Sequence, residues 1–388
     1  MIAAGGKKLH ARFGGKEGKM AKRILLLMLT AALILSLAAC GTSNGAASGG
    51  NLVTPTATGS SPEASGTRVF TDSTGRTVEL PEKLDRIAIT GPTAQIVLFA
   101  LAPEKLVGIS NSWDESAKEF LAPEYYNLPL LGQLYGGKGE MNLEELLKAD
   151  PDVVIDVGEP KDGIAEDMDR LSEQSGIPFL HIDGFTATMG DTYRTLGKLL
   201  GLEEKGEELG TYCDEMYAFA SDLEAKLSPE KKKTALYLLG DSGLNVIPEG
   251  SFHAELLNLI VENAAVLENP SSKGTGNETD LEQLLLWDPE VIFFAPDSIF
   301  DTVGEDPAWQ DLQAIRSGSY YRVPFGPYNW MGFPPSVQRY LGILWAAKLL
   351  YPQVCDYDLY TEIARYFRLF YGCELTQSQF DALVSQQK

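Results

Sequence analysis

The chain has 388 residues and a formal net charge of −22, with 54 acidic against 32 basic side chains. This excess of negative charge repels a phosphate polymer, so nucleic acid is excluded as a partner. The length exceeds that of one typical core and predicts two domains.

The amino-terminal segment has the pattern of an export signal. Lys22 and Arg23 precede an uncharged apolar run at 24–39, which is typical of a secretory signal and shorter than the roughly 20 residues of a spanning helix. The end of the run, Leu37-Ala38-Ala39-Cys40-Gly41, resembles a bacterial lipobox at every position. The resemblance implies that Cys40 becomes the lipidated amino terminus. A signal anchor with an incidental cysteine is the alternative, and translation starts at either Met1 or Met20.

Residues 40–67 are rich in Gly, Ser, Thr, Ala and Pro and hold almost no large apolar side chain. Such a segment cannot bury enough surface to order itself and is predicted to be a flexible tether. The remaining chain is predicted to divide into an α/β lobe at 68–188, a bridging helix at 189–229 and a second α/β lobe with carboxy-terminal helices at 230–388.

Short apolar runs alternate with helical patterns in the first predicted lobe. Strands are expected at 86–90, 106–110, 152–157 and 178–182, and helices at 93–101, 142–149 and 164–175. This alternation predicts parallel βα units, with ligand loops at the carboxyl ends of the strands.

From about 189 to 225 the chain is almost entirely helix-forming, with one break near Gly201. The part at 203–227 would extend about 37 Å, long enough to cross between domains. The alternation then resumes, with strands expected at 234–239, 291–294 and 321–324 and helices at 252–261 and 281–286.

One unit occurs twice in the chain. Met141–Ile155 and Thr279–Phe293 match position by position, and each reads as a capped helix, an acidic residue followed by proline, and a buried strand. The duplication favours two lobes of similar build, although any α/β protein repeats such units to some extent.

The order of these features resembles the helical-backbone class of ABC-transporter solute-binding proteins, which serve ferric siderophores, cobalamin and haem. The likeness covers about 68–388, and the tail, from Pro334-Pro335-Ser336-Val337 to 370–376 (FYGCELT), resembles the iron-complex branch. The resemblance implies two Rossmann-like lobes joined by a long bridging α-helix, a ligand cleft between the lobes, little hinge motion, a monomer, no intrinsic cofactor, and an ABC permease and ATPase as partners. It also implies docking to the permease through one exposed glutamate on each lobe, Glu166 and Glu282, because carboxylates can pair with arginines of a partner.

The loops at the strand ends supply the candidate ligand contacts. They are Thr90, Gly91, Trp113, Gln133, Tyr135, Glu159, His181, Phe185, Asp241, Tyr328, Asn329 and Trp330. The aromatic members suit broad, partly apolar ligands, and Trp113 and Trp330 are expected to face the cleft rather than plug their own lobes. Tyr135 occupies the place where similar haem-binding proteins have an iron-ligating tyrosine, so haem is an alternative ligand.

The expected ligand is a metal chelate. Only Lys138 and Lys273 are basic candidates in the cleft loops, so a neutral or cationic ferric hydroxamate, or a corrinoid, is favoured over an anionic catecholate complex. A bare metal ion is disfavoured because the chain offers too few histidine ligands. It has three histidines, of which His10 is removed with the signal and His253 is expected on a helix surface,.

The remaining signals exclude or leave open other chemistry. The chain lacks the nucleophile elbow, the P-loop and the zinc-protease motif,, and only Glu159 and Asp183 form a conceivable hydrolytic carboxylate pair, so an enzyme is not expected. A scaffold lipoprotein is the other alternative. Cys355 and Cys373 either pair, which leaves Cys213 free, or remain thiols.

Overall fold

A computed structural model describes residues 66–135, 141–227 and 232–385, and these belong to one compact unit. The signal, Cys40, almost all of the predicted tether and Lys138 lie outside the described residues. Within them no helix is long and apolar enough to cross a membrane.

The first lobe is built around the sheet β3-β4-β5, whose pairs are all parallel. Strand β4 is buried along its whole length, as expected of a parallel strand covered on both faces. A separate hairpin, β1-β2, stands beside it. The elements in chain order are β1 (Thr67–Thr71), β2 (Thr77–Pro81), β3 (Ile87–Ile89), α2 (Pro92–Leu101), η1 (Pro103–Lys105), η2 (Glu115–Glu119), α3 (Pro123–Tyr126), α4 (Leu143–Ala149), β4 (Val153–Gly158), α5 (Ile164–Ser175), β5 (Phe179–Asp183) and η3 (Thr186–Thr188).

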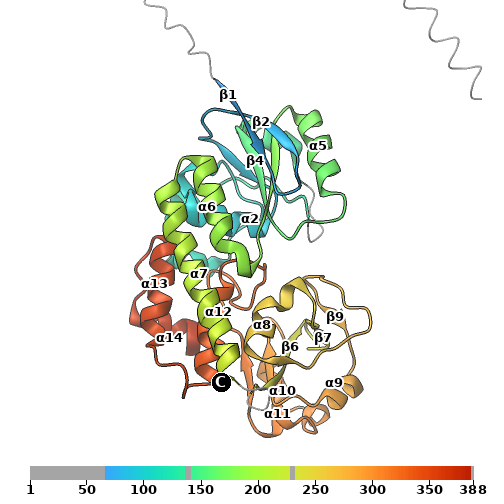
Figure 1. The fold of residues 1–388 in the computed structure, drawn as a ribbon. Coiled ribbons are helices and arrows are strands. Elements are labelled where there is room, and N and C mark those ends of the chain that lie inside the picture. The colour runs from blue at the N-terminus through green and yellow to red at the C-terminus, as the bar shows by residue number, and fades with distance from the viewer. Residues whose placement is uncertain (1–65, 136–140, 228–231, 386–388) are drawn as a thin grey trace, which may run out of the picture. The chain divides into compact units, whose positions relative to one another are not determined.

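Two helices follow, α6 (Met189–Leu200) and α7 (Glu203–Lys226), and Gly201 separates them in a left-handed conformation. They pack side by side, and α7 continues toward the carboxy-terminal helices (Figure 1). Its 24 residues correspond to about 36 Å,. The expected break near Gly201 and the long helix after it are confirmed.

The second lobe holds another sheet, of order β11-β10-β6-β7-β9, with β8 also paired to β6. Strands β6, β10 and β11 run parallel. The elements in chain order are β6 (Thr234–Leu239), β7 (Asn245–Val246), η5 (Phe252–Ala254), α8 (Glu255–Ile260), β8 (Glu262–Asn263), β9 (Asn277–Glu278), α9 (Leu281–Trp287), β10 (Val291–Phe294), α10 (Phe300–Val303), η6 (Pro307–Trp309), α11 (Gln313–Arg316), β11 (Tyr320–Arg322), α12 (Arg339–Leu350), α13 (Leu359–Tyr371) and α14 (Gln377–Ser385).

The predicted α/β fold is therefore confirmed, although β7 pairs antiparallel with β6 and β9 in the second sheet, and one expected strand is absent. Residues 106–110 form only isolated bridges, Leu106 with Ile87 and Ile109 with Leu130. Gly108 explains the close approach there, because a Cβ would lie 2.7 Å from the Pro129 carbonyl.

The structure confirms that the duplicated unit forms a capped helix at equivalent positions in both lobes. Asn142 and Asp280 cap α4 and α9 with their side chains, and Leu146 and Leu284 are both fully buried. Asp150 and Asp288 end the two helices in the left-handed region, at φ 46° and 33°.

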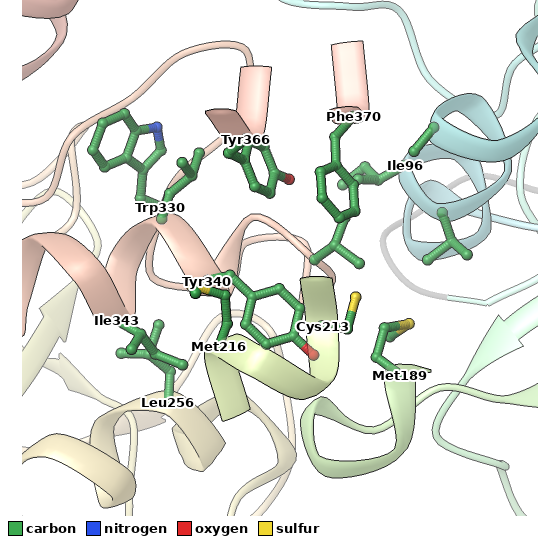
Figure 2. Packing of buried hydrophobic residues seen from close by; sticks show 14 of the residues in the cluster. Ile96, Met189, Cys213, Met216, Leu256, Trp330, Tyr340, Ile343, Tyr366 and Phe370 are labelled. Carbon is green, nitrogen blue, oxygen red and sulfur yellow. The ribbon is translucent and has the colours of Figure 1, made fainter. Parts of the chain in front are cut away.

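One apolar core extends through both lobes. It includes Ile89 of β3 and Phe293 of β10, together with residues of the helices between them. Figure 2 shows its centre, where Ile96 of α2, Cys213 and Met216 of α7, Leu256 of α8, and Tyr340 and Ile343 of α12 lie together. The lobes thus share packed helices in addition to the bridging helix.

Candidate ligand-binding site

The loops after β4 and β5 meet the second lobe at Phe252. The ring of Phe185 approaches Phe252 edge-on at 5.7 Å between centroids, and Lys161 Nζ lies 5.9 Å from the Phe252 centroid. Lys161 also pairs with Glu159 at 2.5 Å. Because these loops follow the carboxyl ends of parallel strands, they occupy the usual ligand edge of the first sheet. We call Glu159, Lys161, Phe185, Phe252, His253 and Phe333 the interlobe face.

His253 is the polar centre of this face. It is buried, and its ring stacks on Phe333 at 4.8 Å. Burial, together with the charges of Arg339 and Lys161, lowers the pKa of His253 to about 4. Its Nδ1 is buried and has no hydrogen-bond partner among the described residues. The expectation that His253 lies on a helix surface was wrong, since Phe252, Phe333 and Gly274 enclose it.

Arg339 underlies the same face and was not predicted. It is 2% exposed, pairs with Glu255 and donates to Thr186 Oγ1 at 3.0 Å and to the Phe252 carbonyl. The guanidinium carbon lies 4.7 Å from the centroid of the Phe252 ring. Its sequence signal is an arginine directly before the apolar run of α12, where helical packing buries it.

Thr90 and His181, predicted as ligand contacts, lie inside the first lobe. The strand register aligns Asp156 with His181 and brings Thr90 beside Asp156. Thr90 donates to one Asp156 oxygen, and His181 Nδ1 lies 2.7 Å from the other. Asp183 lies 3.1 Å from His181 Nε2. Both predicted side chains are 0% exposed, so the structure does not present them at a surface, and their role as ligand contacts stays a prediction.

Burial acts to lower the pKa of His181, but the hydrogen bonds and charges of Asp156 and Asp183 outweigh it and raise the pKa above the ordinary value. His181 and Asp156 are buried, and Asp183 is partly exposed. The buried polar atoms of His181 and Asp156 therefore have hydrogen-bond partners within the lobe,.

Tyr135 is half-buried and its hydroxyl donates to Asp167 at 2.9 Å. Burial, and then Asp167, raises the pKa of Tyr135 far above its ordinary value. Gln133 is buried nearby, and Gly91, the residue before α2, lies half-buried with the Tyr135 carbonyl 3.8 Å from where a Cβ would be.

The two tryptophans expected in the cleft are core residues, so that expectation was wrong. Trp113 is 4% exposed and donates to the Tyr125 carbonyl, and Trp330, visible in Figure 2, is 0% exposed and donates to the Gly326 carbonyl. An indole whose N–H has a partner can be buried without penalty. Tyr328 accepts from Gln95, and Asn329 donates to the Tyr237 hydroxyl at 2.8 Å, so these two side chains are also engaged internally.

Asp241, a predicted ligand contact, and the predicted docking residues Glu166 and Glu282 are all exposed. Asp241 lies in the turn after β6, Glu166 in the first turn of α5 and Glu282 in the first turn of α9. Within the described part of the chain none of the three makes an ion pair, so each is available to a partner.

Other features of the described residues narrow the chemistry. No group of three or more metal-ligating side chains occurs among them, and Cys213, Cys355 and Cys373 are thiols. Two surface hollows, of about 630 and 480 Å³, lie between α7 and α13 and beside Phe300 and Tyr320. Neither is lined by a predicted ligand residue.

Comparison with known proteins gives the class. Residues 87–326 match the family model described as periplasmic binding protein. The chain belongs to this family. Its members bind small solutes outside the cytoplasm for ABC importers, so the predicted class, a solute-binding protein and not an enzyme, is confirmed.

Several relatives of this binding protein have names or structures. It is 24% identical to a molybdate-binding protein of Haemophilus influenzae, over 78% of this chain and 91% of that one, and 22% identical to an iron-uptake system-binding protein of Bacillus subtilis, over 82% and 96%. A solved ABC transporter solute-binding protein of Sulfurospirillum deleyianum has a TM-score of 0.75 and 27% identity, covering 82% of this chain and 99% of that one.

Proposed function

We propose that this binding protein captures a compact anionic metal species, of which molybdate is the simplest probe, at the interlobe face. The observation that carries the proposal is the pair of cations at His253. Arg339 and Lys161 both lie against the Phe252 ring and both act to lower the pKa of His253, although each is paired with a glutamate and the whole chain is at −22. An anion is favoured near fixed cations whose charge is incompletely screened by solvent.

The position of the two cations supports this ligand class. Lys161 belongs to the first lobe and is 43% exposed on its side chain, so it can leave Glu159 for a ligand. The sequence-based preference for a neutral or cationic chelate depended on a pocket poor in bases, and the exposed side chain of Lys161 weakens that reason. The molybdate-binding relative, named above, is consistent with the same class.

A ferric siderophore is the second candidate. The rings of Phe185, Phe252 and Phe333 line the same face, and flat apolar side chains suit chelates larger than an oxyanion. The iron-uptake relative supports it, and cobalamin or haem would use the same rings.

Isothermal titration of the purified protein tests both candidates. We expect saturable one-to-one binding of molybdate, or else of a ferric hydroxamate or catecholate complex, and no turnover of either. Lys161→Gln should weaken anion binding about tenfold, the equivalent of about 1.4 kcal/mol, whereas Lys198→Gln on the exposed face of α6 should leave it unchanged. Binding of cobalamin alone, or of no anion, would refute the anionic class.

Docking to the permease is proposed to use exposed glutamates at the helix starts. Glu282 is the second residue of α9, and the duplicated unit places Glu144 at the equivalent point of α4. Each helix precedes a parallel strand and runs back along it, so its first turn lies at the edge where the strands end. Glu166, the prediction from family resemblance, is tested beside them.

Uptake by cells that carry only the variant chain distinguishes these acids. We expect Glu282→Lys and Glu144→Lys to reduce uptake at least tenfold while ligand affinity is unchanged, since a like charge opposes the arginines of a partner. Glu166→Lys is the third arm, and loss of uptake there with none at Glu144 would restore the original assignment.

The anchor, the boundaries and the oligomeric state complete the proposal. We expect lipid on Cys40, which mass spectrometry of the membrane fraction would detect and which Cys40→Ser should abolish.

We place the boundaries of the bridging helix at 188/189 and 229/230. Limited proteolysis of the protein should therefore spare the helix between them. Light scattering should give the mass of a monomer.

A further inference from the structure

Arg339 is a buried cation that joins four segments. It begins α12, pairs with Glu255 at the start of α8, donates to Thr186 after β5, and donates to the carbonyl of Phe252 in η5. Thr186 itself donates its N–H and its hydroxyl to the same Glu255 oxygen. The first lobe is therefore tied to the second through one arginine and one carboxylate.

The burial of Arg339 leaves no exposed group of its side chain for a ligand. The side chain is 2% exposed, and both terminal nitrogens are engaged. Its Nε lies against Gly332, where an added Cβ would lie 2.7 Å away, and Gly332 adopts φ +98°. Solvent does not reach the guanidinium, so its effect on a ligand passes through the residues that it holds.

Those residues belong to the interlobe face. Arg339 holds Phe252 twice, through the carbonyl and through the ring face, and Phe252 in turn contacts Phe185 and Lys161 of the first lobe. His253 follows Phe252 directly, and the backbone of Gly332 bonds to it. A change at Arg339 therefore moves both the aromatic contact and the imidazole.

We propose that Arg339 is a positioning residue that fixes Phe252 and His253 against the loops of the first lobe and thereby sets the shape and polarity of the interlobe face. That the interlobe face binds the ligand rests on the proposed function, whereas the positioning itself does not. The charged groups that face His253 are Arg339 from α12 and Lys161 from the loop after β4, with Glu255 and Glu159 paired to them.

The test compares two variants in the full-length exported chain. Arg339→Gln with Glu255→Gln removes the buried pair without leaving either charge unpaired, and Arg339→Lys keeps the charge but loses the fork that reaches Thr186, Glu255 and Phe252 at once. Arg365→Gln, which breaks the surface pair with Glu215, is the matched control. NMR measures the titration of His253 and the contacts between the Phe185 and Phe252 rings.

The double variant should raise the titration midpoint of His253 toward the ordinary histidine value and should weaken the Phe185–Phe252 contacts. Arg339→Lys should weaken the same contacts while the midpoint stays low, and Arg365→Gln should change neither. If the double variant does not fold, the lysine variant still decides the geometry. Unchanged ring contacts in Arg339→Lys would overturn the proposal.

Ligand titration separates this inference from the proposed function. If molybdate or the ferric complexes bind, the double variant should lose about tenfold or more in affinity, the equivalent of about 1.4 kcal/mol. If none of them binds the unmodified protein, the proposed ligand class fails while the NMR results still judge the positioning role.

Discussion

At the scale of single residues, the two described histidines respond to opposite environments. His253 is packed between aromatic rings and cations, and its pKa falls to about 4. His181 lies between two carboxylates, and its pKa is raised. The same residue type therefore contributes to stability with opposite dependence on pH.

For His253 the unfolded chain binds a proton more readily than the folded protein. Its contribution is thus complete above about pH 6.5 and is lost as the pH falls toward 4, with about 3 kcal/mol as the order of magnitude,. His253→Gln should remove this loss, so the free energy of unfolding in urea should fall less between pH 7 and pH 4.5 than in the unmodified protein. An equal fall in both proteins would contradict the assignment.

For His181 the folded protein binds the proton more readily. Its contribution is complete below the unfolded pKa and is lost as the pH rises through the raised folded pKa,. His181→Gln should therefore destabilise the protein more at pH 5 than at pH 8, the reverse of His253→Gln, in the same urea titrations. A larger loss at pH 8 would show that Asp156 and Asp183 do not hold a charged imidazole.

At the scale of elements, the helices α6 and α7 approach each other through glycines. A Cβ on Gly206 would lie 2.7 Å from the Tyr193 carbonyl and 2.9 Å from the Gly197 Cα. These are backbone atoms and cannot rotate away, so Gly206→Ala should cost about 1–3 kcal/mol, more than the gain of up to about 1 kcal/mol in helix propensity. Thermal unfolding measures the difference, and Glu204→Ala on the exposed side should change stability by less than about 0.5 kcal/mol. A stabilised Gly206→Ala would mean that the helices are farther apart.

The duplicated helix ends provide a second prediction, because the two left-handed aspartates differ in their bonds. Asp288 Oδ1 accepts from the Gln313 N–H at 2.7 Å, whereas the Asp150 side chain is exposed and makes no such bond among the described residues. Asp150→Gly should therefore be neutral or stabilise by up to about 1 kcal/mol. Asp288→Gly should destabilise by about 1 kcal/mol, because the Gln313 N–H loses its partner. Denaturant melts of the two variants test this, and equal effects would contradict it.

The elements were largely predictable from the sequence, and the site was not. Period, proline and glycine located β4, α5, α7 and the duplicated α4–β4 and α9–β10 units, because these signals are local. The hydrogen-bond partners of the buried Trp113, Trp330 and His181 side chains are Tyr125, Gly326 and Asp156, and no periodic signal in the sequence marks these pairs. Arg339 was missed for the same reason, since only the fold brings Thr186 and Glu255 to it.

At the scale of the whole molecule, the lobes are held by three kinds of contact. The bridging helix α7 packs on α8 and α12, the shared apolar core runs between the two sheets, and the Arg339 contacts cross between the lobes near the interlobe face. A hinge needs a few residues that absorb a large change in backbone angles. A continuous helix with packed neighbours offers none, so the two lobes should keep one separation whether or not a ligand is bound.

Spin labels at Glu173 on α5 and Glu305 beyond α10, both exposed, measure that separation. The labels are attached to cysteines introduced at these two positions in a Cys40→Ser, Cys373→Ser background. Cys213 and Cys355 can remain, because each is 1% exposed and reacts poorly,. We expect one narrow distance distribution that shifts by less than about 2 Å with saturating molybdate or ferric complex, below the displacement typical of hinge closure. Arg339→Lys should broaden the distribution, because it removes the Arg339 contacts but leaves the helix. Two separate populations in the unmodified protein would mean that the lobes move as hinged bodies and that the bridging helix does not set their spacing.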